Sequence, residues 1–131
     1  MGKMEITFNR VIIFCGDVNK LKTFYQEYFG FRLVEEIKDE WAVLNTGQTE
    51  IAFHKIGDAY RNNDQPFRAD SNTKLVFEIS GDLEAFREDL LAKAVLLKEI
   101  KSFKGFDFIL CDGEDPEGNV FQVKQKTTGT V

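Results

Sequence analysis

The side chains that could carry out acid–base or metal chemistry are few in this chain. Its 131 residues include one histidine, His54, so imidazole chemistry is restricted to a single position. Because an imidazole titrates near neutral pH, His54 could be a polar residue satisfied within the fold, a hydrogen-bonding contact to a ligand, or a general base. No nucleophile stands beside it in the sequence, and we therefore expect these three roles in that order of preference.

The two cysteines, Cys15 and Cys111, each lie in an apolar, strand-like run. A reactive thiolate needs an electropositive neighbourhood, which neither local sequence supplies. Cysteine is also among the residue types most often found fully buried. The sequence therefore predicts two buried, free thiols, as is usual in a reducing compartment.

The elements that must position these side chains form an internal repeat. A strand, a Gly-Asp step and an amphipathic helix occur first over residues 10–30 and again from residue 74. Each step ends in a good helix N-cap, Asp17 or Asp82, because a carboxylate accepts hydrogen bonds from the unpaired N–H groups of the first turn. Gly30 then provides a left-handed stop for the first helix.

Three strand-like runs follow each helix, at 31–37, 40–45 and 49–55 in the first half and at 95–101, 106–111 and 119–126 in the second. The pattern predicts an α+β fold in which residues 1–131 form a single domain of two βαβββ modules, at about 5–56 and about 73–126, joined by a linker at 57–72. Because a helix covers only one face of each sheet, we expect the modules to pair into a curved mixed sheet with a cleft.

The charge balance excludes some classes of partner. A formal net charge of −5 argues against nucleic acid, since phosphate binding needs a basic surface. No apolar run approaches the about 20 residues that span a bilayer, and the first residues carry no signal-peptide pattern. We therefore expect a cytoplasmic protein with neither a nucleic-acid nor a membrane partner.

Several short motifs occur in a definite order along the chain. They are Gly16-Asp17 before the first helix, Phe24-Tyr25 within it, Phe29-Gly30-Phe31 at its end, Gly81-Asp82-Leu83 at the second helix, and Asp115-Pro116-Glu117-Gly118-Asn119 before the last strand. With these motifs the sequence resembles, over nearly its whole length, the vicinal-oxygen-chelate superfamily (the glyoxalase/bleomycin resistance protein/dioxygenase family). Its members include lactoylglutathione lyase, extradiol dioxygenases, fosfomycin-resistance enzymes and bleomycin-binding proteins. The resemblance implies the paired-module fold and a homodimer.

The resemblance also implies a place for a metal ion, held by the first and last strand of each module. Arg10 and Lys74 stand where relatives have histidine. Ala52 stands where they often have glutamate or histidine, and Gln122 where they have glutamate. Two cations repel a divalent ion, alanine offers no donor, and a single histidine cannot supply the imidazoles of such a site. We therefore expect no metal, no other cofactor, and no metal-dependent glyoxalase or dioxygenase activity.

Strand alternation assigns further side chains to the cleft, because every second residue of a strand faces the same way. If Arg10 faces the cleft, the hairpin around Gly47 places Trp41 there too, opposite His54. The ligand-binding residues expected on this basis are Arg10, Trp41, His54, Lys74, Glu78 and Gln122.

Two outcomes are open for the cations of this cleft. Arg10 could hold a carboxylate or phosphate through its guanidinium fork, with Lys74 as a second positive charge. Alternatively Arg10 pairs with Glu78 and Lys74 with Glu50, which would leave a satisfied polar core without a ligand.

We expect the protein to bind a small molecule that is anionic or aromatic. It would do so without a metal, as a protein similar to the bleomycin-resistance branch of the family. The sequence favours binding over catalysis. Two alternatives remain. One is a metal-independent, lyase- or isomerase-like enzyme of the same fold with His54 or Glu78 as its base. The other is a structural or partner-binding dimer whose cleft is filled by its own side chains.

Overall fold

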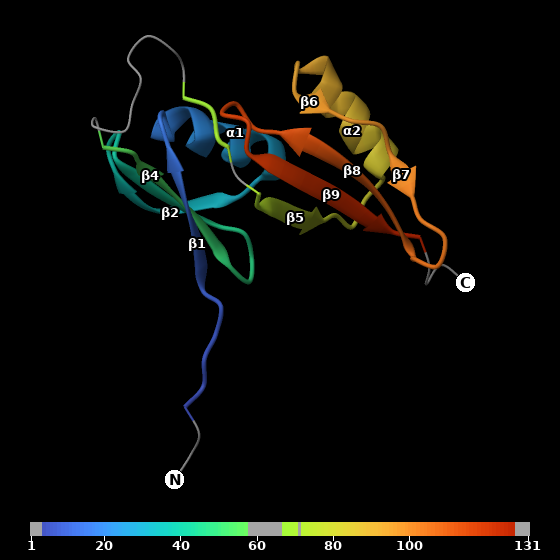
Figure 1. Cartoon of the computed structure of the whole chain (residues 1–131), viewed down its shortest axis with the longest axis horizontal. Helices are drawn as coiled ribbons and strands as arrows, with labels where there is room; N and C mark the ends of the chain where they lie inside the picture. Colours follow the sequence, from blue (N-terminus) through green and yellow to red (C-terminus); the bar gives the residue numbers. More distant parts are fainter. Residues whose placement is uncertain (1–3, 58–66, 71, 128–131) are drawn as a thin grey trace. The chain divides into compact units, whose positions relative to one another are not determined.

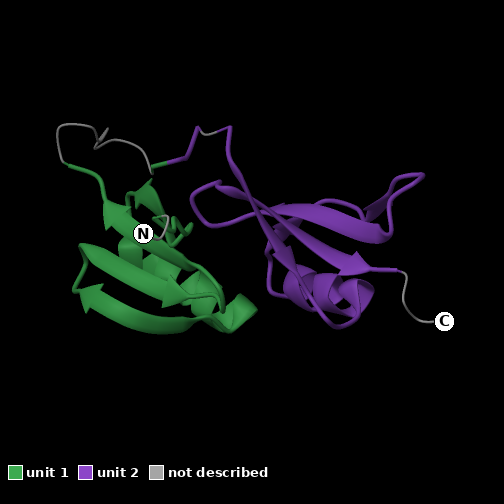
Figure 2. Cartoon of the chain, turned by 90° about the horizontal axis from the view of Figure 1, so that it is seen from below, with its two compact units in different colours: residues 1–67 green, residues 68–131 purple. Residues whose placement is uncertain are grey.

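The computed structural model describes residues 4–57, 67–70 and 72–127 (Figure 1). It divides the chain into two compact units, Met1–Phe67 and Arg68–Val131, which we call module one and module two (Figure 2). Much of the linker expected at 57–72 lies outside the described residues. None of the helices in the described part of the chain is long and apolar enough to cross a bilayer.

Module one is a four-stranded mixed sheet with one helix. Its elements are β1 (Arg10–Cys15), α1 (Val18–Phe29), β2 (Arg32–Ile37), β3 (Trp41–Asn45) and β4 (Glu50–Lys55). The strand order is β1-β4-β3-β2, in which β1 and β4 are parallel and the other pairs antiparallel. A β-α-β-β-β path of this kind is the one that the repeat predicts.

Module two follows the same path with one interruption. Its elements are β5 (Lys74–Glu78), α2 (Leu83–Ala92), β6 (Leu96–Leu97), β7 (Lys101–Ser102), β8 (Phe108–Glu114) and β9 (Val120–Lys126). The order is β5-β9-β8-β6, with β5 and β9 parallel and β7 also paired to β8. The predicted α+β fold of two βαβββ modules is thereby confirmed, and β6 and β7 together take the place of β2.

Both helices begin where the Gly-Asp steps predict. The Asp17 carboxylate accepts a hydrogen bond from the backbone N–H of Lys20 at 3.0 Å, and Asp82 caps α2 in the same manner. Gly30 ends α1 at a φ of 70°, a left-handed conformation that costs little only for glycine. Local side-chain chemistry therefore sets the ends of the helices before any packing does.

The core of each module lies between its helix and one face of its sheet. In module one, Tyr25 of α1 stacks on Phe53 of β4 with ring centroids 5.5 Å apart, and neither side chain is exposed. In module two, Leu83 and Phe121 are likewise fully buried, and the Gln125 side chain accepts a hydrogen bond from the first N–H of α2. Each such apolar side chain stabilises the fold by about 1.5–3 kcal/mol relative to its exposed state.

The strand bounds expected in module two need correction. The run predicted at 95–101 is split into β6 and β7, and β8 runs beyond the predicted end at Cys111 to Glu114. The sequence Asp112-Gly113 suggests a turn, but a Cβ on Gly113 would lie 2.5 Å from Leu97 Cδ2. The glycine is therefore required by close packing inside a strand and does not end it.

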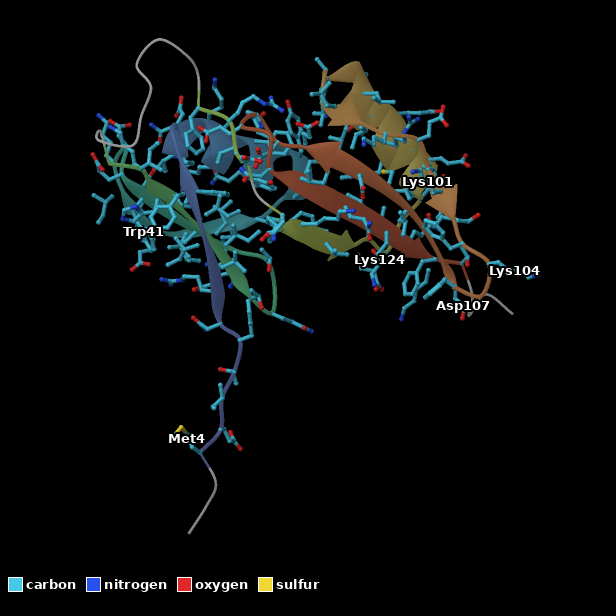
Figure 3. The ribbon with its side chains drawn as sticks, in the orientation of Figure 1. Met4, Trp41, Lys101, Lys104, Asp107 and Lys124 are labelled. Carbon is cyan, nitrogen blue, oxygen red and sulfur yellow. The ribbon has the colours of Figure 1, made fainter. Side chains whose placement is uncertain are left out.

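An exposed segment precedes β1. Glu50 donates its backbone N–H to the carbonyl of Asn9 at 3.1 Å, which continues the ladder by one residue. Before it, Met4, Ile6 and Phe8 are 84%, 87% and 73% exposed. Figure 3 shows Met4 on the extended segment that leads into β1.

The turn between β8 and β9 is organised by one buried carboxylate. Asp115 is 4% exposed and accepts backbone hydrogen bonds from Glu117 at 2.9 Å and Asn119 at 3.0 Å. It also accepts one from the Asn119 side chain at 2.8 Å. The motif Asp115-Pro116-Glu117-Gly118-Asn119 therefore stabilises the turn that connects two central strands of the sheet.

Replacing Asp115 by alanine should lower the free energy of unfolding by about 2–3 kcal/mol, because buried donors lose a charged acceptor. Urea denaturation measures the change. The matched control is Asp70→Ala, at an exposed aspartate, which should alter stability by less than about 0.5 kcal/mol. Equal losses in the two variants would contradict the role given to the Asp115 hydrogen bonds.

Candidate functional site

Strand pairing fixes which side chains of module one share the sheet face opposite α1, called here the open face. Phe53 packs on Tyr25 of α1, so the even-numbered residues of β4 point to the open face. Three rows of paired residues cross β1, β4 and β3 there: Arg10–Glu50–Asn45, Ile12–Ala52–Val43 and Phe14–His54–Trp41. The pairing of Trp41 with His54 is the one that the hairpin predicts.

Arg10 is held by two carboxylates on this face. Its Nε and Nη2 both donate to Oε1 of Glu50, at 2.9 and 2.7 Å, and Nη2 lies 3.5 Å from Oε2 of Glu35. The indole N–H of Trp41 donates to the same Glu35 oxygen at 3.3 Å, and the Arg10 guanidinium carbon is 5.7 Å from the indole centroid. This Arg10 cluster joins one positive group to two negative groups, so the cation is compensated within its own module.

Aromatic rings follow one another along the last of the three rows. Phe14 and His54 have ring centroids 5.2 Å apart, and His54 and Trp41 have centroids 5.7 Å apart, both in edge-to-face arrangements. Ile37 of β2 pairs with Trp41 and extends the row across the whole sheet. We call Phe14, His54, Trp41 and Ile37 the aromatic row; Phe14 and Ile37 are 59% and 62% exposed.

The orientation of His54 follows from one hydrogen bond. Its Nδ1 lies 2.9 Å from the carbonyl oxygen of Lys55, which can only accept. Nδ1 therefore carries the proton, and in the neutral ring Nε2 keeps its lone pair. The side chain is exposed, so this nitrogen is the acceptor that His54 offers on the open face.

Module two has its own open face, opposite α2, and its polar centre is Asp112. Lys74 Nζ donates to Oδ2 of Asp112 at 2.9 Å, and Gln122 Nε2 donates to Oδ1 at 3.0 Å. Both carboxylate oxygens are thus engaged by residues that the sequence singles out, whereas Asp112 itself is missing from the expected site. The alternation of Leu110, Asp112 and Glu114 would have revealed it if β8 had been extended through Gly113.

Each of the two cations has a carboxylate partner within its own module. Arg10 pairs with Glu50 and Glu35, and Lys74 pairs with Asp112. The alternative pairs, Arg10 with Glu78 and Lys74 with Glu50, would join the two modules and stay predictions of the sequence. Glu78 lies 4.0 Å from Lys126 on the neighbouring strand. In each case the partner is a residue of the same sheet, one to three strands away. The shared cleft between modules stays a prediction of the sequence.

Two pKa values respond to these surroundings. Partial burial would raise the pKa of Asp112, but the hydrogen bonds from Lys74 and Gln122, together with nearby positive charge, outweigh it and lower the pKa. Burial raises the pKa of the Cys111 thiol despite the positive charge of Arg87. Cys15 and Cys111 are both buried, and neither is joined in a disulfide, as predicted.

With this geometry established, comparison with known proteins gives the family. A profile of the Glyoxalase/Bleomycin resistance protein/Dioxygenase superfamily matches residues 7–123, and the chain therefore belongs to this superfamily. No curated protein matches the chain.

Solved structures of this fold resemble the chain over most of its length. Lactoylglutathione lyase from Agrobacterium tumefaciens has a TM-score of 0.72 at 14% identity, covering 98% of this chain and 100% of that one. An integron cassette protein from the mobile metagenome of V. Cholerae has a TM-score of 0.70 at 19% identity, covering 95% and 98%. The fosfomycin resistance protein FosX from Listeria monocytogenes has a TM-score of 0.68 at 16% identity, covering 96% of each chain. At these identities the likeness shows the fold alone.

The residues at the metal-ligand positions do not fit a metal ion. Arg10 and Lys74 are cations bound to carboxylates, Ala52 has no donor atom, and the Gln122 amide donates its N–H to Asp112. Among the residues that the structure describes, no three His, Cys, Asp or Glu side chains form a group that could hold a metal.

The lowered pKa of Asp112 gives a pH-dependent prediction. Its ionised form stabilises the fold above the unfolded-state pKa, and this stabilisation is lost as the pH falls through the folded-state pKa. Lys74→Met should lower the unfolding free energy by at most about 1 kcal/mol at neutral pH, because the ion pair is partly exposed. The difference from wild type should disappear in acid, where Asp112 is protonated.

Urea denaturation over a pH series measures this effect. Lys104→Met is the control, because Lys104 is exposed and belongs to none of the ion pairs found in the described residues. It should show no pH-dependent difference from wild type. A Lys74→Met deficit that stayed constant into acid would show that the ion pair does not set the pKa of Asp112.

Proposed function

We propose that the protein binds a planar, aromatic small molecule on the open face of module one, without a metal ion. The observation that supports this proposal is the aromatic row, in which three rings and an isoleucine stand side by side across four strands, with two of the side chains more than half exposed. Stacking of a flat ligand on such rings contributes about 0.5–1.5 kcal/mol per aromatic pair beyond the area that it buries.

The charges on this face favour a neutral or cationic ligand over an anionic one. Arg10, the group expected to bind an anion, already carries short hydrogen bonds to Glu50 and lies near Glu35. An anionic ligand would have to compete with both carboxylates, and the Arg10 cluster bears one net negative charge. The aromatic part of the expected ligand class is therefore better supported than the anionic part.

Catalysis by a base is the second candidate. His54 presents an unprotonated Nε2 when neutral, because Nδ1 donates to the Lys55 carbonyl. This nitrogen could accept a proton from a ligand that lies on the aromatic row. Glu78, the other candidate base, belongs to module two, and its Oε2 lies 4.0 Å from Lys126 Nζ. An enzyme of this kind would lose turnover in His54→Ala while it retained ligand binding.

The emission of Trp41, the only tryptophan, should report binding. Three probes share one ring and differ in charge: nicotinamide, nicotinate and 1-methylnicotinamide. We expect saturable quenching by the neutral and cationic probes and weaker binding of the anion. Phe14→Ala should raise the Kd of nicotinamide about fivefold, which corresponds to the loss of about 1 kcal/mol of ring contact.

The control for this substitution is Phe8→Ala, which removes another exposed phenylalanine outside the aromatic row. Its Kd should equal that of wild type. Linear, non-saturable quenching that is identical in the two variants would indicate collisions in solution and would sink the proposal. If nicotinate bound more tightly than the other two probes, the ligand would be anionic, contrary to the charge argument above.

The proposal of a metal-independent site is tested separately. Elemental analysis of purified protein should find no stoichiometric zinc, nickel, iron or manganese, because Arg10 and Lys74 occupy ligand positions. A chelator should leave the melting temperature unchanged. About one tightly held divalent ion per chain, with a melting temperature that falls on chelation, would overturn this part of the proposal.

A further inference from the structure

Module two contains a hollow where β6 pairs with β8. Its volume is about 270 Å³, and it is lined by Leu96, Leu97, Lys98, Asp112, Gly113, Glu114 and Val120. Strand pairing places Leu96 beside Glu114, and the backbone N–H of Lys98 donates to the carbonyl of Asp112 at 2.8 Å. The hollow is therefore built by β6, β8 and β9 of one sheet, together with Lys98 directly after β6.

The lining is apolar apart from three charged groups, and two of these are already paired. Asp112 is bound by Lys74 at 2.9 Å, and Glu114 is bound by Arg68 at 2.8 Å. Lys98 belongs to none of the ion pairs found among the described residues. Its positive charge helps to lower the pKa of Asp112, but within the described part of the chain the ammonium group is not held in an ion pair, unlike the side chains of Lys74 and Arg68.

The size of the hollow limits the ligand. Sites for drug-sized ligands have volumes of about 300–1,000 Å³, so a volume of about 270 Å³ suits a smaller molecule. A cationic ligand would find both carboxylates already occupied. A short aliphatic acid can lay its apolar part on Leu96 and Val120 while its carboxylate meets Lys98.

We propose that this hollow of module two binds a small monocarboxylic acid with a branched or ring-shaped apolar part. Lys98 holds the carboxylate of the ligand as a point charge on a flexible side chain. Leu96, which is 62% exposed, supplies an apolar contact. Gly113 also lines the hollow, and a Cβ at this position would lie 2.6 Å from Phe121 Cζ and 2.9 Å from the backbone oxygen of Leu96, so a larger residue would force its neighbours to shift.

The test uses 4-methylpentanoate as the probe and its amide, 4-methylpentanamide, as the uncharged analogue. In titrations followed by ¹H–¹⁵N NMR of the full chain, millimolar 4-methylpentanoate should shift the backbone N–H signals of Lys98, Gly113 and Val120. The uncharged analogue 4-methylpentanamide should bind about three- to fivefold more weakly, as expected for the loss of a partly exposed charge contact. Lys98→Met should remove this preference, so that acid and amide bind equally, and Lys98→Arg should restore it.

Matched variants separate the two parts of the ligand. Lys101→Met changes an exposed lysine of the same edge that does not line the hollow, and it should bind like wild type. Leu96→Ala should weaken acid and amide by the same factor. Shifts without preference for the acid, preference unchanged in Lys98→Met, or no shift at these amides would each overturn the proposal. Because the readout is at Gly113 and not at Trp41, these results are independent of the proposal for module one.

Discussion

The parallel pairing of the first and last strand in each module is the constraint on which the rest depends. Two parallel strands cannot be joined by a hairpin, so the chain must cross over, and here α1 and α2 form part of the crossing. Each helix then covers one face of its sheet, and the even-numbered residues of β4 and β9 are left on the other. The open faces are thus consequences of strand direction, and the sequence only decides which side chains occupy them.

What occupies them differs between the modules, although Arg10 and Lys74 both begin a first strand. Arg10 finds its main acceptor on the adjacent strand β4, whereas Lys74 reaches Asp112, two strands away. Both modules thus place a cation at the start of the first strand and give it a carboxylate partner, but the partner stands on a different strand in each. Because each cation has a partner in its own sheet, neither open face carries an uncompensated cation at this position.

Much of the fold could be predicted because its signals are local. Asp17, Asp82 and Gly30 set the helix ends through their own hydrogen bonds or backbone conformation, and period-two alternation identifies β1 and β4. The end of β8 could not be predicted, because Gly113 is required by contacts with Leu97 and Phe121 that only the folded sheet brings together. Asp112 was missed for the same reason. The ion partners of Arg10 and Lys74 also depend on which strands become neighbours.

The exposed segment before β1 has a practical consequence. Met4, Ile6 and Phe8 have the same parity as Arg10, Ile12 and Phe14, so exposed apolar side chains lie on both sides of Arg10 along the strand at the end of the sheet order of module one. A long apolar edge is a template onto which other strands add, and natural proteins protect such edges with lysine or proline. Charge at this edge should oppose such addition, so Ile6→Lys should make the protein easier to concentrate.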